Sequence, residues 1–226
     1  NRTGPFEPKA GGQGGTCGQR NRGIAAGLER HAAMSTAGRV FWVRHGPTHA
    51  KAMVGWSDIP ADLSDTAQIA RLNAVLPREA VVISSDLIRA VATADAIAGS
   101  RSRLQHDPNL REINFGDWEM QDFETIEDQE RLRAFWDEPG LVRAPSGETW
   151  NDVVDRVDNS IAKVLAAHPV SDIVAVAHMG AILTQVQKAE RVTAYEAFAQ
   201  RIDNLSVTEL VLDGDGWRSV RINHCP

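Results

Sequence analysis

The sequence predicts an α/β fold in which helices alternate with the strands of a mostly parallel, doubly wound sheet. Three short runs of branched, aromatic and small apolar residues are typical of buried strands, at residues 40–43, 81–83 and 173–177. Polar residues follow each run, and segments with helical periodicity lie between the runs. This alternation of strand and helix patterns favours the α/β class over an all-helical or all-strand architecture.

Turn and cap residues set the limits that we expect for elements in the first half of the chain. Ser64 is expected to cap a helix that ends before Pro77. The alanine-rich segment 89–98 predicts a second helix, which ends at Gly99. A short strand is expected near residues 103–106.

The second half of the chain predicts more helices and a closing hairpin. The clearest helix follows residues 145–148, where apolar side chains recur at helical spacing up to Leu165. The last two apolar runs flank Asp213-Gly214-Asp215-Gly216, a sequence typical of a β-hairpin turn. The remaining expected elements are helices over 122–136, 180–189 and 194–200 and strands over 206–212 and 217–222.

Composition restricts the class of protein. Of the 226 residues, 42% are hydrophobic and 24% charged, values that are ordinary for a globular protein. The net charge of −6 argues against a nucleic-acid partner bound through a general basic field. Cys17 and Cys225 suggest no disulfide framework, so we expect a reducing, cytoplasmic environment. No apolar stretch has transmembrane length, so we expect no membrane partner either.

The first segment differs from the rest of the chain. Residues 1–33 hold eight of the 18 glycines and carry five basic against two acidic residues. Such a glycine- and arginine-rich segment without periodicity predicts disorder. Met34 is a plausible start of the protein, six residues before the first strand. We therefore expect a tail over 1–38 without catalytic residues and one domain over 39–226.

Candidate site residues follow the three predicted strands. Arg44 and His45 come directly after the first strand, Arg89 lies shortly after the second, and His178 follows the third. In open α/β sheets, ligands bind at the carboxyl ends of the strands, and parallel strands bring these ends to one edge. Guanidinium groups match phosphate oxygens, and a neutral imidazole nitrogen is a nucleophile. This pattern indicates transfer of a phosphoryl group to a histidine.

Several motifs in order resemble the histidine phosphatase superfamily, the phosphoglycerate mutase-like proteins. The first is Val43-Arg44-His45-Gly46-Pro47-Thr48, and the second histidine follows Ala177. The resemblance covers about residues 40–220 and implies a three-layer sandwich with a mostly parallel central sheet. The other matching blocks are Gly55-Trp56-Ser57-Asp58 with Leu63-Ser64, Ser84 to Ala90 with Thr93-Ala94, Leu110 to Glu119, and Pro145-Ser146-Gly147-Glu148 with Arg156.

The resemblance also implies a role for each candidate. His45 would attack phosphorus and become phosphohistidine, while Arg44, Arg89 and His178 would surround the phosphoryl oxygens. Glu112 would protonate the leaving oxygen and then activate water. These roles require no metal and no cofactor, because the cationic side chains and the histidine stabilise the developing charge.

Some positions leave alternatives open or depart from the family pattern. Asp117 and Glu119 are rivals of Glu112 as the proton donor, and Thr48 either binds phosphate or only shapes the turn. His49 and His106 have no motif support. Other departures are Pro47 where many members have an acidic residue, Lys51 where many have asparagine, and Met179 where many have glycine.

We expect a phosphomonoester hydrolase that acts on a small phosphorylated metabolite, with motifs most similar to the α-ribazole phosphatases and broad-specificity phosphatases. The alternatives are a cofactor-dependent mutase and a non-catalytic protein that binds phosphorylated ligands. Glu112 and His178 are only 66 positions apart. We expect this interval to leave little chain for a lid, and the mainly acidic segment 119–139 to repel anionic esters. The sequence predicts no oligomeric state.

Overall fold

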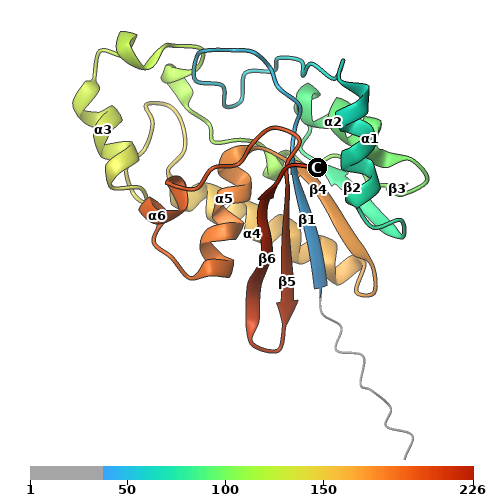
Figure 1. Cartoon of the computed structure of the whole chain (residues 1–226). Coiled ribbons are helices and arrows are strands. Elements are labelled where there is room, and N and C mark those ends of the chain that lie inside the picture. Colours follow the sequence, from blue (N-terminus) through green and yellow to red (C-terminus); the bar gives the residue numbers. More distant parts are fainter. Residues whose placement is uncertain (1–37) are drawn as a thin grey trace, which may run out of the picture. The chain divides into compact units, whose positions relative to one another are not determined.

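The computed structural model describes residues 38–226, and the ribbon is shown in Figure 1. The predicted tail, apart from Gly38, lies outside the described residues. Six strands form one sheet in the order β3-β2-β4-β1-β5-β6. Their bounds are Gly38–Arg44 (β1), Ala80–Ser84 (β2), Ser102–Arg103 (β3), Asp172–Ala177 (β4), Val207–Asp213 (β5) and Gly216–His224 (β6).

The sheet is mostly parallel, as the sequence predicted. Strands β1, β2, β3 and β4 pair in parallel, whereas β5 pairs antiparallel with both β1 and β6. The helices among the described residues are α1 (Thr66–Val75), α2 (Ile88–Ala98), α3 (Gln129–Asp137), α4 (Trp150–Ala167), α5 (Met179–Glu190) and α6 (Ala194–Phe198). Three 3-10 turns, η1, η2 and η3, cover Pro108–Leu110, Gly116–Trp118 and Phe123–Thr125.

Three expected elements differ from the structure in detail. The side chain of Asp65, not Ser64, caps α1 by accepting a hydrogen bond from Gln68 N. The expected helix 122–136 divides into η3 and α3, because Asp128 caps a new helix start and accepts from Arg131 N. Strand β3 has only two residues and lies slightly earlier than 103–106.

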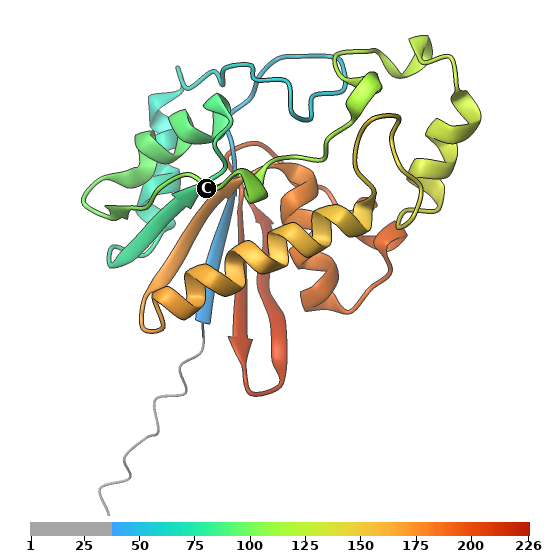
Figure 2. The ribbon, with the colours of Figure 1, turned by 180° about the vertical axis from the view of Figure 1, so that it is seen from behind.

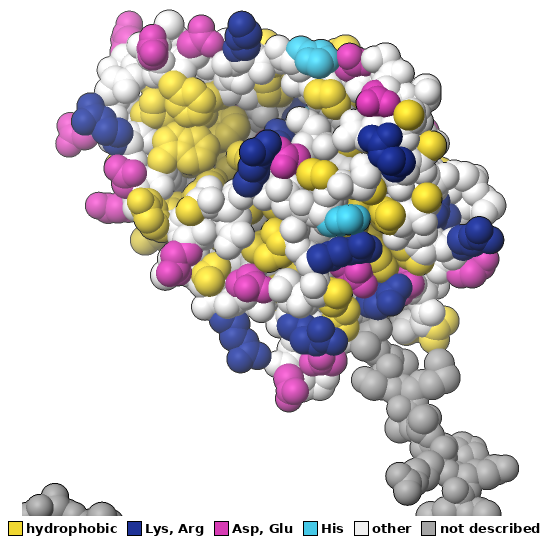
Figure 3. Space-filling model, viewed as in Figure 1, with side chains coloured by type: hydrophobic (Ala, Val, Ile, Leu, Met, Phe, Trp, Pro, Cys, Tyr) yellow, Lys and Arg dark blue, Asp and Glu magenta, His cyan; other side chains and the backbone are white. Residues whose placement is uncertain are grey.

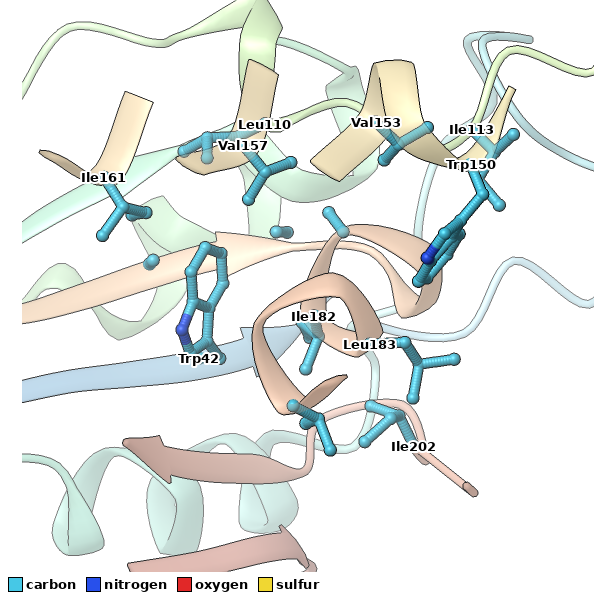
Figure 4. Close-up of a cluster of buried hydrophobic side chains, with 14 of the residues drawn as sticks. Trp42, Leu110, Ile113, Trp150, Val153, Val157, Ile161, Ile182, Leu183 and Ile202 are labelled. Atoms are coloured by element: carbon cyan, nitrogen blue, oxygen red, sulfur yellow. The ribbon is translucent and has the colours of Figure 1, made fainter. Parts of the chain in front are cut away.

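The alternation of side chains along β1 builds two separate cores. Val40 and Trp42 belong to a core with residues of α4 and α5, whereas Phe41 and Val43 belong to a core with residues of α1 and α2. Successive side chains of a strand point to opposite faces, so helices cover both faces and make a three-layer sandwich. Figure 2 shows α4 lying across one face of the sheet. Figure 4 shows the ring of Trp42 pointing from β1 towards α4.

The parallel register places the carboxyl ends of three strands together. Arg44 pairs with Ala177, and Ser84 pairs with Val176. Just beyond the strands, His45 N donates to Ala177 O at 3.1 Å, and Ser85 N donates to Val176 O at 3.0 Å. The common edge expected from the sequence is therefore present. Among residues 38–226, no helix combines the length and hydrophobicity needed to span a bilayer.

Replacement of Ile161 by alanine should lower the free energy of unfolding by about 2–5 kcal/mol, because it leaves a cavity between α4 and the sheet. Ile161 is fully buried in the core that includes Trp42. Val170→Ala is the control, since its side chain is 85% exposed and its loss should change stability by less than about 0.5 kcal/mol. Denaturant titration measures both variants, and equal midpoints would contradict the assigned core.

Candidate active site

His45 occupies the end of β1 in a fixed orientation. Its Nδ1 lies 2.7 Å from Gly46 O, and because a carbonyl only accepts, Nδ1 donates this bond. The proton is thereby held on Nδ1, which leaves a lone pair on Nε2. Gly46 N donates to Thr93 Oγ1, and Asn204 Nδ2 donates to His45 O. A Cβ at residue 46 would lie 2.5 Å from a methyl group of Leu63, so this close approach requires glycine.

Two arginines flank His45 and are anchored by backbone carbonyls. Arg44 donates from Nη1 to Ile202 O at 2.5 Å. Arg89, at the start of α2, donates to Ser57 O at 2.8 Å and to Gly55 O at 2.6 Å. Neither arginine forms a salt bridge with a described carboxylate. Their positive charges are therefore held in place without being neutralised by a direct ion pair.

His178 lies behind His45 and is fully buried at the junction of β4 and α5. The centroids of the two imidazole rings are 5.0 Å apart. Neither ring nitrogen of His178 has a hydrogen-bond partner within residues 38–226. Buried polar groups normally have a partner, so this imidazole is suited to contact a ligand group.

Glu112 is buried beside the first turn of α5. Its Oε1 accepts hydrogen bonds from Gly180 N at 2.9 Å and from Ile113 N at 3.0 Å. Burial raises the pKa of this carboxyl above its ordinary value, although the two N–H groups and the nearby cations Arg44 and Arg89 oppose the shift. A carboxyl with a raised pKa is suited to donate a proton near neutral pH.

The two rival carboxylates have other contacts. Glu119 accepts from the backbone N–H groups of Gly55, Trp56, Ser57 and Phe115 and from the Ser57 hydroxyl. It therefore holds the loop whose carbonyls bind Arg89.

Asp117 lies on an exposed turn and accepts from the hydroxyl of Ser146. Of the three acidic residues, Glu112 is the one that lines the cavity beside His45.

A cavity of about 210 Å³ joins these residues. Arg44, His45, Arg89 and Glu112 line it close enough together for their charges to act on one another, and we call these four residues the reacting end. His178 is not among the lining residues, and its ring lies 5.0 Å from that of His45. The rest of the wall is mainly apolar. The other lining residues are Thr48, Ala50, Ala52, Met53, Val54, Ile113, Phe115, Phe123, Trp136, Met179, Gly180 and Phe198.

The electrostatics of the cavity favour neutral imidazoles. Burial lowers the pKa of His45 to about 3, and the positive charges of Arg89 and Arg44 act in the same direction. Burial, with the nearby His45 and Arg89, also lowers the pKa of His178 well below its ordinary value. Burial lowers the pKa of both arginines too, while the Glu112 carboxyl acts against this shift. An arginine side chain nevertheless stays cationic in proteins, so the cavity combines a neutral imidazole with two cations.

The aromatic wall is what sequence reasoning missed. Phe123 and Trp136 belong to the segment 119–139, which the sequence predicts to repel anionic esters, yet both line the cavity. This segment therefore contributes to the cavity wall, and the expectation that little chain remains for a lid stays a prediction. The aromatic side chains on this otherwise charged segment were the feature of the sequence that could have indicated a role in the site. Figure 3 shows hydrophobic side chains gathered around a hollow on the side where α3 lies in Figure 1.

The ion pair of Arg156 with Glu148 fixes the backbone next to Glu112. Arg156 forms a salt bridge with Glu148 at 2.8 Å and also donates to the backbone carbonyls of Asn109, Arg111 and Glu112. The Ser-Gly-Glu and Arg156 motifs of the sequence thus fix the segment that carries Glu112.

The remaining candidates lie outside the catalytic cluster. Thr48 and Met179 line the cavity, whereas Lys51 is exposed. His49 pairs with Asp62, and His106 contacts Ser84 and Arg103. Within the described part of the chain, no group of three or more His, Cys, Asp or Glu side chains is placed to hold a metal ion.

Comparison with known proteins identifies relatives over almost the whole described chain. The model of the histidine phosphatase superfamily (branch 1) matches residues 40–224. The probable phosphoglycerate mutase GpmB of Proteus mirabilis is 27% identical over 79% of this chain and 87% of its own length. The adenosylcobalamin/alpha-ribazole phosphatase of Escherichia coli is 27% identical over 73% of this chain and 85% of its own. The structure of mycobacterial glucosyl-3-phosphoglycerate phosphatase aligns with a TM-score of 0.72 at 26% identity, covering 83% and 99% of the two chains.

Replacement of Gly180 by alanine should lower kcat/KM by about 100-fold or more, because small displacements of a catalytic group are costly. The added Cβ would lie 2.3 Å from Glu112 Oε1 and must displace this carboxyl or α5. Gly214→Ala is the matched control, since no atom lies within 4 Å of its added Cβ. Steady-state kinetics on both purified variants checks the effect, and normal turnover by Gly180→Ala would show that the position of Glu112 is unimportant.

Proposed function

The chain belongs to the histidine phosphatase superfamily (branch 1), and on this premise we propose that it hydrolyses small phosphate monoesters through a phosphohistidine. The observation that carries the proposal is the shared cavity of His45, Arg44, Arg89 and Glu112. It combines a nucleophile, two phosphate-compatible cations and a proton donor, which together satisfy the requirements of phosphoryl transfer.

In the first half-reaction, Nε2 of His45 attacks phosphorus and the bond to the ester oxygen breaks. The bond from Nδ1 to Gly46 O keeps the ring in the orientation and tautomer that this attack needs. Glu112 gives its proton to the departing oxygen, so the alcohol leaves neutral. The alcohol is the first product and the phosphoryl group stays on His45.

In the second half-reaction, water replaces the alcohol. The Glu112 carboxylate accepts a proton from this water, whose oxygen attacks phosphorus as the bond to Nε2 breaks. Phosphate then leaves, and Glu112 is protonated again. Arg44 and Arg89 stabilise the negative charge on the phosphoryl oxygens in both steps. His178 is not among the lining residues, although its ring lies 5.0 Å from that of His45, so its contact with phosphate stays a prediction.

We also propose that the reaction needs no divalent metal and takes place in the cytoplasm. The two guanidinium groups already provide the charge stabilisation that a metal supplies in other phosphoryl-transfer sites. The small number of cysteines supports a reducing compartment. The named substrate of the Escherichia coli relative makes α-ribazole phosphate the first candidate substrate.

The mutase alternative has weaker support from the cavity. A phosphoglycerate mutase must hold a substrate carboxylate in addition to the phosphoryl group. Arg44 and Arg89 are the cationic side chains among the residues that line this cavity, and both lie at the reacting end. The apolar remainder of the wall offers no charge partner for a carboxylate, which favours hydrolysis of esters with uncharged alcohols.

His45→Ala should lower turnover by about 10³-fold or more, since it removes the nucleophile. Rapid acid-free quenching of the unchanged protein with a ³²P-labelled ester should trap an acid-labile phosphohistidine that His45→Ala protein does not form. His106→Ala is the control, because His106 lies outside the cavity. Near-normal turnover by a folded His45→Ala protein would refute the mechanism.

Glu112→Gln should slow alkyl phosphates by about 10²–10⁴-fold and 4-nitrophenyl phosphate much less, because a phenolate needs little protonation to leave. Asp117→Asn is the matched control and should leave both substrates unaffected. Equal losses on the two substrates would reject Glu112 as the proton donor.

The same variant has a signature in the pH profile. Only protonated Glu112 donates a proton, so kcat/KM for an alkyl ester should fall as pH rises through the raised pKa of this carboxyl. His45, with a pKa of about 3, is neutral throughout this range. This fall of kcat/KM at high pH should disappear in Glu112→Gln. If the fall persists in the variant, a group other than Glu112 titrates.

The hydrolase assignment predicts that phosphate release outpaces isomerisation. The assay supplies 3-phosphoglycerate with a trace of 2,3-bisphosphoglycerate and follows 2-phosphoglycerate and free phosphate by ³¹P NMR, with His45→Ala protein as the blank. Isomer formation much faster than phosphate release would establish the mutase instead.

A further inference from the structure

Four aromatic side chains of the cavity wall, which we call the aromatic end, come from four separate segments. Phe115 precedes η2, Phe123 lies in η3, Trp136 in α3 and Phe198 in α6. The Trp136 ring lies 5.2 Å from Phe198, 6.0 Å from Phe115 and 6.1 Å from Phe123, measured between centroids. Each distance falls in the range in which aromatic rings stabilise one another. The wall is thus one connected cluster centred on Trp136.

This wall is partly accessible. The side chain of Phe123 is 49% exposed, although it packs against Trp136 and lines the cavity. Met53, Val54 and Met179 extend the apolar surface towards the reacting end. An apolar surface next to a catalytic centre gains free energy when a ligand of similar polarity removes it from water.

The ionisable residues that line the cavity are those of the reacting end, Arg44, His45, Arg89 and Glu112. The remaining lining residues have no ionisable side chain. An anionic group on the alcohol part of a substrate would therefore be desolvated against aromatic rings without a charge partner, which is unfavourable. The wall selects against substrates with a second negative charge.

Building on the proposed function, we infer that the physiological ester carries an uncharged aromatic ring on its alcohol part, which binds against Phe123, Trp136 and Phe198. The phosphoryl group occupies the end formed by Arg44, His45 and Arg89, and the ring occupies the aromatic end of the same cavity. Ring stacking and T-shaped contacts give such a ligand an advantage beyond area burial alone.

The test compares phosphate esters that differ only in the substituent on the alcohol part. We choose 2-phenylethyl phosphate, 2-cyclohexylethyl phosphate and ethyl phosphate, which are all primary alkyl esters and thus place similar demands on the chemical step. The unchanged protein should have a kcat/KM for 2-phenylethyl phosphate about tenfold or more above that for ethyl phosphate, mainly through KM. The cyclohexyl ester should fall between the two, because it keeps the apolar area and loses the ring electrons.

Phe123→Ala should reduce the ratio of kcat/KM for 2-phenylethyl phosphate to that for ethyl phosphate to about threefold or less. Phe123 is suitable because it is 49% exposed, and the loss of an exposed side chain leaves the fold intact. Tyr195→Ala is the control, since Tyr195 lies on α6, is 58% exposed and does not line the cavity. The control should keep the ratio of the unchanged protein.

A binding experiment separates the aromatic site from the proposed hydrolysis. His45→Ala protein should bind 2-phenylethyl phosphate about tenfold more tightly than ethyl phosphate by calorimetry. If His45→Ala protein prefers 2-phenylethyl phosphate but the unchanged protein hydrolyses none of the esters, the aromatic site stands and the proposed hydrolase function is overturned. Turnover of all three esters at equal kcat/KM, or an unchanged ratio in Phe123→Ala, would overturn the aromatic site and leave the hydrolase intact.

Discussion

The parallel pairing of β1 with β4 is the constraint on which the catalytic cavity depends. It aligns Arg44 with Ala177, so the residues that follow the two strands, His45 and His178, meet at one edge with their rings 5.0 Å apart. Strand β2 adds Arg89 through the loop that follows Ser84. A slip of one residue would turn every side chain of β1 to the opposite face and exchange the two cores. The hydrophobic pattern of the sheet therefore specifies the site as well as the fold.

Burial determines the charge states at this edge. Two imidazoles and a carboxyl are removed from water, and each favours its neutral form as a result. The two arginines keep their charge and are oriented by carbonyl oxygens rather than by carboxylates. Two positive charges without direct ion-pair partners match the charge of a phosphate monoester dianion, so the cavity is electrostatically complementary to the ligand class that the family implies.

The two ends of the cavity are built differently. The reacting end rests on strand ends, the start of α5 and the loop held by Glu119, and backbone groups anchor Arg44, Arg89 and Glu112 there. At the aromatic end, Phe123, Trp136 and Phe198 come from η3, α3 and α6. If the proposed function holds, substitutions among Phe123, Trp136 and Phe198 change which alcohol is accepted more than they change the chemistry at phosphorus.

The sequence by itself determined the α/β class and most of the helices and strands, and it placed Arg44, His45, Arg89 and His178 just beyond strand ends, because apolar runs and local motifs report burial and strand ends directly. It left Glu112, Asp117 and Glu119 as alternatives, and only the tertiary structure showed that Glu119 holds the 55–57 loop. The division of segment 122–136 depended on the Asp128 cap, and the aromatic wall on contacts between α3 and α6. Such contacts join residues far apart in the chain, and no local pattern records which apolar side chains face a cavity and which face the core.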